Sequence, residues 1–122
     1  MPFKTTLSMS KRAPRLLLED MVLASQKITT YTKEQTFESF VGNALIVDAV
    51  VRNFEILGEA ASKMPQAFAT KHPQIPWRQI KDYRNRLIHE YFGIDPHIKW
   101  TLRSNEIPKL TALLESLLAQ AH

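Results

Sequence analysis

The sequence predicts an all-α fold, specifically an antiparallel four-helix up-and-down bundle with one or two additional short helices. No stretch alternates apolar and polar residues for long enough to form a convincing strand. Apolar residues instead recur at spacings of three and four, which is the pattern of an amphipathic helix. Prolines divide the chain into segments with short connections, and short connections make consecutive helices antiparallel neighbours.

The first helix is predicted from Pro14 to about Tyr31. Its apolar stripe consists of residues spaced four, three, four and three apart, which are Leu17, Met21, Ala24, Ile28 and Tyr31. Residues 1–13 are polar and basic and lack this periodicity, so we expect a flexible basic N-terminal tail. The helical domain is therefore predicted over residues 14–122.

The second element is predicted as one long helix from Lys33 to Met64, a segment without proline. Its centre is apolar on almost every face, as expected for a helix buried in the middle of a bundle. Gly42 and Gly58 should each weaken this helix by about 1 kcal/mol relative to alanine without breaking it. Pro65 should end it.

A polar stripe runs along this otherwise apolar helix, at residues spaced four, three and four apart, which are Asp48, Arg52, Glu55 and Glu59. One interpretation is a solvated edge with an Asp48–Arg52 ion pair one helical turn apart. The other is a face on which Arg52 or Glu59 meets a partner or a cleft. The sequence leaves both interpretations open.

A connector with three prolines follows, over residues 65–76, and should hold one short helical turn. Pro76 is expected to be the first residue of the next helix, because proline suits that position. Gly93 is expected to end this helix with a left-handed cap. Ile80, Tyr83 or Leu87, Ile88 and Tyr91 are predicted to pack inward from it.

Two elements complete the predicted bundle. Asp95 followed by Pro96 is a strong start signal for a short helix that reaches about Arg103. The last helix is predicted over residues 105–120, with Pro108 tolerated in its first turn. Its apolar face should consist of Ile107, Leu110, Leu113, Leu114 and Leu117.

Length and composition restrict the class of protein. The 122 residues suit one domain, and 44% hydrophobic with 23% charged residues is ordinary for a globular fold. Cysteine is absent, which excludes disulfides and is compatible with a reducing cytoplasm. No apolar run is long enough for a membrane span and no secretory signal is recognisable, so we expect a cytoplasmic protein without a membrane partner. The net charge of +4 favours polyanions without specifying one.

The stretch from Trp77 to Asp95 combines helical apolar spacing with a cluster of polar side chains, which are Arg84, Asn85, Arg86, His89, Glu90 and Tyr91. These residue types suit phosphoryl chemistry on RNA. A histidine can take the proton from a 2′-hydroxyl or give one to the leaving 5′-oxygen, which is typically worth about 10²- to 10⁴-fold in rate. An arginine offers a planar, permanently charged fork to the non-bridging oxygens.

Arg84 and His89 are therefore the candidate catalytic residues. Asn85, one turn before His89, could orient the imidazole by a hydrogen bond. On a straight helix, residues five apart diverge by about 140°, so the two catalytic side chains could share a groove only loosely. The alternative is a capped, salt-bridged surface in which these cations lie beside Asp82 and Glu90.

The charge balance of this stretch leans slightly toward an anionic partner, because four basic residues, Arg78, Lys81, Arg84 and Arg86, accompany two acidic ones. We predict Arg78, Lys81 and Arg86 as RNA-binding residues. The remaining histidines, His72, His97 and His122, show no metal-ligand spacing with His89. Neither a metal site nor a cofactor is predicted.

At these residues the chain resembles a known family. The string "RNRLIHEY" is similar to the R-x4-H-x-Y signature of HepT-like toxins in the HEPN superfamily, with Arg84, His89 and Tyr91 at the signature positions. The string "VVRNFEILGEAA", residues 50–61, resembles the long second helix of that family, and "YFGID" followed by "IKW" resembles its continuation. The similarity spans about residues 14–120.

The resemblance implies a metal-independent endoribonuclease, the toxin of a toxin–antitoxin pair. Arg84 and His89 would be catalytic, with Asn85 and Glu59 supporting, and cleavage by the 2′-hydroxyl would leave a 2′,3′-cyclic phosphate. Family members form homodimers that bring two motif helices together, which would reunite an arginine and a histidine that one helix splays. Transfer RNA is a candidate substrate by family analogy.

The resemblance also implies a partner, a minimal nucleotidyltransferase antitoxin (MntA-like) that transfers AMP to the motif tyrosine, here Tyr91. The alternative for Tyr91 is that it only packs against Arg84 and the bundle. The alternative for the whole protein is a non-catalytic helical module that docks a nucleotidyltransferase or a nucleotide through the same helix.

Overall fold

The structure, a computed structural model, describes residues 13–83, 100 and 102–120. Within these residues it contains no strand, and the predicted all-α class is confirmed. The helices are α1 (Pro14–Thr32), α2 (Phe37–Val41), α3 (Ala44–Lys63), α4 (Gln66–Lys71), a helix described over residues 77–83, a π-helical turn η3 (Leu102–Glu106) and α7 (Ile107–Gln120).

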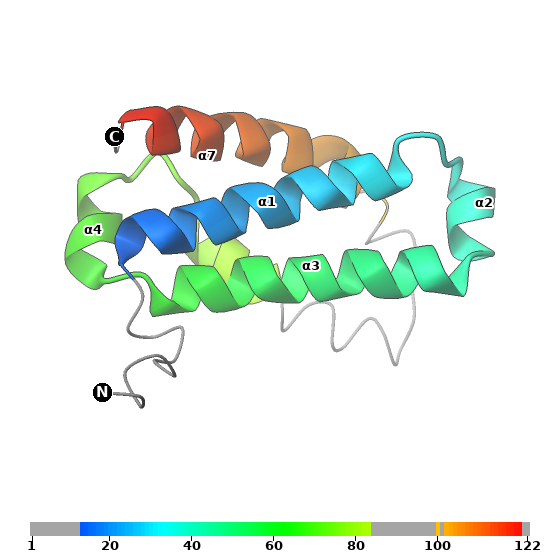
Figure 1. The fold of residues 1–122 in the computed structure, drawn as a ribbon, viewed down its shortest axis with the longest axis horizontal. Helices are drawn as coiled ribbons and strands as arrows, with labels where there is room; N and C mark the ends of the chain where they lie inside the picture. Colours follow the sequence, from blue (N-terminus) through cyan, green and yellow to red (C-terminus); the bar gives the residue numbers. More distant parts are fainter. Residues whose placement is uncertain (1–12, 84–99, 101, 121–122) are drawn as a thin grey trace, which may run out of the picture.

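The bundle is formed by α1, α3, helix 77–83 and α7, and Figure 1 shows α1, α3 and α7 lying side by side. α1 packs against both α3 and α7, and the chain runs in the opposite direction along each of these two neighbours. Helix 77–83 completes the bundle on the side of α3 and η3, since Tyr83 contacts Phe54 of α3 and Glu106 of η3. The predicted up-and-down order is therefore confirmed for the described helices. α4 lies across one end of the bundle.

The core is built from one apolar face of each long helix, as the helical spacing predicts. The fully buried side chains include Leu17, Leu18, Met21 and Ile28 of α1, Val50, Phe54 and Leu57 of α3, and Ile107 and Leu114 of α7. Two predicted members of the stripes are instead partly exposed, Tyr31 and Leu113, each at 37%. Thr32 occupies the buried position next to Tyr31, where its hydroxyl is satisfied by donating to the carbonyl oxygen of Ile28 at 2.7 Å.

The prediction of a single helix over residues 33–64 is wrong. α1 continues to Thr32, and the chain then forms α2 before α3 begins. Thr36 starts α2 with a reciprocal cap, in which its hydroxyl accepts from the amide of Ser39 at 3.1 Å and the Ser39 hydroxyl accepts from the amide of Thr36 at 2.9 Å. Asn43 then caps α3 by accepting from the amide of Ile46 at 3.1 Å. These caps satisfy backbone groups that a continuous helix would otherwise pair, so the cost of Gly42 is enough to end α2 there.

The burial of α3 agrees with the prediction in the second half of the helix and differs from it in the first turn. The second half is buried as expected, and Gly58 is accommodated within it. The first turn is only partly buried: Ile46 and Val47 pack against the core, whereas Leu45 is 83% exposed. The apolar composition of this turn therefore did not lead to burial on every face.

The later boundaries agree with the sequence to within a few residues. The short turn predicted in the connector is α4, and the next helix begins at residue 77, one residue later than expected. Pro108 lies in the first turn of α7 as predicted, but α7 continues directly from η3 rather than starting at residue 105. The short helix predicted over 95–103 lies largely outside the described residues, as does the basic tail apart from Ala13. None of the described helices is both long and apolar enough to cross a membrane.

Candidate nucleic-acid interface

The predicted catalytic cluster lies outside the described residues. This applies to Arg84, Asn85, Arg86, His89 and Tyr91, so their roles and mutual distances stay predictions. The structure does describe residues 77–83, which immediately precede Arg84 in the chain. This helix carries two of the predicted RNA-binding residues, Arg78 and Lys81.

Helix 77–83 is held by its inward face. Trp77, Ile80 and Tyr83 are buried, as a spacing of three on a helix allows, and the prediction that Ile80 and Tyr83 pack inward is confirmed. The indole N–H of Trp77 donates to the carbonyl oxygen of His72 at 2.9 Å, which ties the start of the helix to the end of α4. The Tyr83 ring packs edge-on against Phe54, with ring centroids 5.4 Å apart.

A second contact links this helix to the C-terminal part of the bundle. The Tyr83 hydroxyl donates to Glu106 Oε1 at 3.2 Å, and the side-chain amide of Gln79 donates to the same oxygen. Glu106 therefore accepts hydrogen bonds from the face of the helix that carries residues 79 and 83. The remaining face of the helix, with residues 78, 81 and 82, points outward.

The outward face carries two cations, Arg78 and Lys81, which meet no acidic partner among the described residues. Arg78 and Lys81 are exposed, and within the described part of the chain neither forms an ion pair or a hydrogen bond. The ion pair that the structure records there joins Arg15 and Glu19, at 3.3 Å. A guanidinium and an ammonium that are solvated and unpaired can accept phosphate oxygens without first breaking an internal contact.

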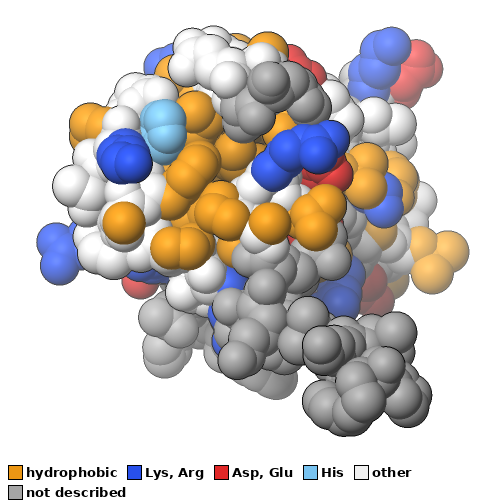
Figure 2. All heavy atoms as spheres, turned by 60° about the vertical axis from the view of Figure 1, so that its left-hand side comes forward, with side chains coloured by type: hydrophobic (Ala, Val, Ile, Leu, Met, Phe, Trp, Pro, Cys, Tyr) orange, Lys and Arg blue, Asp and Glu red, His pale blue; other side chains and the backbone are white. Residues whose placement is uncertain are grey.

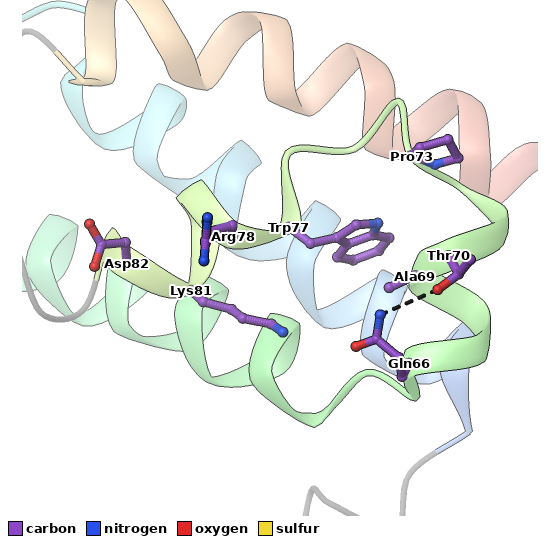
Figure 3. Close-up of a pocket in the computed structure, with 8 residues that line it drawn as sticks. All are labelled: Gln66, Ala69, Thr70, Pro73, Trp77, Arg78, Lys81 and Asp82. Atoms are coloured by element: carbon purple, nitrogen blue, oxygen red, sulfur yellow. Dashed lines mark hydrogen bonds between the residues drawn. The ribbon is translucent and has the colours of Figure 1, made fainter.

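These two cations border a groove between helix 77–83 and α4, which we call the α4 groove. Its volume is about 630 Å³, and it is lined by Gln66, Ala69, Thr70, Pro73, Trp77, Arg78, Lys81 and Asp82. Figure 3 shows that Lys81 extends across the groove toward Gln66 and that the Trp77 ring lies between helix 77–83 and α4. The Asp82 side chain points away from Trp77 and Gln66. The groove thus has an apolar floor and a cationic edge.

Apolar and cationic side chains also lie together over a wider area, at the end of the bundle on which α4 lies. Hydrophobic side chains gather in the middle of this face, and Lys and Arg side chains lie around them (Figure 2). A second hollow of about 650 Å³ adjoins the α4 groove and shares Trp77, Arg78 and Asp82 with it. Arg78 therefore stands between two hollows on one continuous surface.

The residues contributed by α4 were not predicted from the sequence. Gln66 and Thr70 bring an amide and a hydroxyl to the groove, joined by a hydrogen bond of 3.3 Å. The sequence identified this region only as a connector with one helical turn. Because the approach of α4 to Trp77 depends on tertiary packing, no local pattern indicated it.

The polar stripe of α3 is described in full and differs from the first interpretation. Asp48 and Arg52 are exposed and form no ion pair with each other, since two solvated side chains gain little from pairing at a surface. Arg52 and Glu59 instead line a small hollow of about 240 Å³ between α1 and α3, together with Asp20 and Lys27. The supporting role assigned to Glu59 stays a prediction.

No group of three His, Asp or Glu side chains among the described residues is placed to hold a metal ion. Three of the four histidines, His89, His97 and His122, lie outside that part of the chain.

Comparison with known proteins decides the family. The sequence profile described as "Ribonuclease HepT-like" matches residues 21–117, which is most of the chain. The chain belongs to the HepT-like ribonuclease family. A protein of Thermococcus cleftensis named "Probable ribonuclease HepT" is 39% identical over 107 residues, which cover 88% of this chain and 97% of that protein. A protein of Caldanaerobacter subterraneus named "Putative RNase TTE0752" is 36% identical over 107 residues, covering 88% of this chain and 96% of that protein.

No solved structure matches the chain significantly. The HepT-like relatives are matched over nearly their whole length, so the likeness concerns the entire domain and not an isolated motif. The matched residues include helix 77–83, the α4 groove and the R-x4-H-x-Y signature that follows them.

Proposed function

We propose that this HepT-like protein is a metal-independent endoribonuclease and the toxin of a toxin–antitoxin pair. The observation that carries the proposal is the complete R-x4-H-x-Y signature, Arg84, His89 and Tyr91, in a chain that belongs to this ribonuclease family over most of its length. The names of the two relatives support ribonuclease activity. Arg78 and Lys81, which are exposed and form no ion pair within the described part of the chain, support an anionic substrate.

In the proposed reaction, the 2′-oxygen of a ribose attacks the adjacent phosphorus and the bond from phosphorus to the 5′-oxygen breaks. His89 serves as the general base for the 2′-hydroxyl proton or as the general acid that protonates the leaving 5′-oxygen. Arg84 binds the non-bridging oxygens, whose negative charge grows in the transition state. The products are a 2′,3′-cyclic phosphate and a 5′-hydroxyl, and Asn85 and Glu59 act as supporting residues.

A homodimer is part of the proposal because of the helix geometry. Two side chains five residues apart on a straight helix diverge by about 140°, which places them poorly for one phosphate. If two protomers bring their motif helices together, an arginine and a histidine can meet at the seam between them. Transfer RNA is the candidate substrate.

Neutralisation is proposed to occur at Tyr91, through AMP transferred by a minimal nucleotidyltransferase antitoxin. The added phosphodiester carries one negative charge. At about 5 Å from a substrate phosphate and an effective dielectric constant near 20, that charge costs roughly 3 kcal/mol, and the added bulk at the mouth of the cleft hinders the substrate further.

Expression of the chain without its antitoxin tests the proposal. The wild-type protein should arrest growth of a bacterial host, whereas Arg84→Ala and His89→Ala should allow growth while keeping the helical circular-dichroism signal of the wild type. Equal growth with all three chains would contradict the toxin proposal and favour a module that only docks a nucleotidyltransferase or a nucleotide.

A further inference from the structure

The α4 groove lies close to the proposed catalytic arginine along the chain, whatever the backbone conformation between them. Arg84 follows Lys81 by three residues. Three residues span at most about 11 Å, so the Cα atoms of these two residues cannot be farther apart than that. A polymer bound at Arg84 needs to extend only a short distance along the chain to reach Lys81 and the groove that it borders.

The chemistry of the groove fits a nucleotide. Arg78 and Lys81 are exposed and unpaired within the described residues, and a phosphodiester supplies the negative charge that would complement them. Pro73, Ala69 and the small part of Trp77 that stays exposed supply an apolar surface for a base. Gln66 and Thr70 supply an amide and a hydroxyl that can hydrogen-bond to a ribose hydroxyl or a base edge.

The groove is also held in a defined shape. Trp77 is only 9% exposed, and its indole is fixed by the hydrogen bond to His72 and by an edge-on contact with Phe68, with ring centroids 6.3 Å apart. Asp82 also lines the groove but points away from Trp77 and Gln66, so Arg78 and Lys81 leave the groove with a net positive charge.

We propose that the α4 groove binds single-stranded RNA next to the cleaved phosphodiester, with Arg78 and Lys81 on backbone phosphates and a base against the floor that Trp77 forms. This inference rests on the proposed ribonuclease function and assigns a substrate subsite to residues that lie before the signature. Its test therefore separates RNA binding from cleavage.

The first measurement is the affinity for an RNA that cannot be cleaved, a single-stranded oligonucleotide with 2′-O-methyl groups throughout. The double variant Arg78→Ala/Lys81→Ala should weaken binding about 10- to 30-fold at 0.1 M salt. The slope of log K against log salt concentration is negative, and its magnitude should decrease by about 1.4, because each lost phosphate contact on a single strand accounts for about 0.7.

The matched control is Lys33→Ala/Lys109→Ala, which removes the same number of charges. Both lysines are exposed, one at the end of α1 and one in the first turn of α7, away from α4. This variant should keep the wild-type salt slope. If it loses as much affinity and slope as the groove variant, the effect is one of net charge, and the groove proposal is overturned.

A second measurement tests the position of the base. The chain has two tryptophans, so Trp100→Phe leaves Trp77 as its sole tryptophan. RNA binding should then change the emission of Trp77, and unchanged emission under saturating RNA would place the RNA elsewhere and overturn the proposal. Loss of nucleotidyltransferase binding in the groove variant, with RNA affinity intact, would identify a protein-docking groove and overturn it as well.

The two proposals fail in different ways. If the wild type cleaves RNA and the groove variant has an unchanged affinity and KM, the subsite is wrong and the ribonuclease proposal stands. If the wild type binds RNA through the groove without cleaving it, the subsite stands and the ribonuclease proposal fails. If both proposals hold, the groove variant cleaves with a raised KM and a kcat within about threefold of wild type.

Discussion

Trp77 and Tyr83 show how single side chains place the surface next to the proposed active site. Each has a buried ring and a polar atom that donates to another segment, the indole to the His72 carbonyl five residues earlier and the hydroxyl to Glu106. The sequence predicted the inward direction of Tyr83, because apolar spacing on a helix reports which residues share a face. It could not predict His72 or Glu106 as partners, since helical spacing carries no information about atoms outside the helix itself.

Tyr91 is the residue for which the proposed regulation makes the sharpest prediction. When the protein is co-expressed with its nucleotidyltransferase, the intact mass should increase by one or more AMP units, and peptide mapping should place them on Tyr91. Tyr91→Phe should keep its unmodified mass, because it lacks the phenolic oxygen that would carry the phosphate. An adduct that persists in Tyr91→Phe would rule out this tyrosine as the target.

At the scale of single elements, the prediction that failed is the continuous helix over residues 33–64, because the chain forms α2 between α1 and α3. Apolar composition and the absence of proline favoured one helix, while the local caps at Thr36 and Asn43 favoured two. Side-chain caps compete directly with helix continuation, and periodicity in hydrophobicity does not detect them. By contrast, the boundaries marked by Pro65 and Pro76 were predicted to within one residue, because proline limits a helix by steric exclusion.

The cap at Thr36 should contribute measurably to stability. Thr36→Ala removes the oxygen that accepts from the amide of Ser39, and we expect the free energy of unfolding in urea to fall by about 1 kcal/mol. Thr30→Ala is the matched control, because it deletes the same atoms from an exposed position inside α1. It should be neutral or slightly stabilising, since alanine favours a helix interior. A neutral or stabilising effect of Thr36→Ala would contradict the role of the cap.

At the scale of the whole molecule, the bundle could be predicted because burial of apolar stripes and short connections restrict how a chain of four helices packs. The α4 groove could not, because it arises where a connector helix folds back beside Trp77, and neither segment shows this in its own pattern. Arg78 and Lys81 were identified by charge alone. The structure adds that they share one outward face and border one groove.

The measurement that tests the account most directly is cleavage of single-stranded RNA by the purified wild type and by His89→Ala, in the presence of a metal chelator. The wild type should produce 2′,3′-cyclic phosphate ends, and His89→Ala, folded as judged by circular dichroism, should be at least about 100-fold slower. Equal cleavage by the two proteins, or no cleavage by the wild type until a divalent metal is added, would contradict the proposed mechanism.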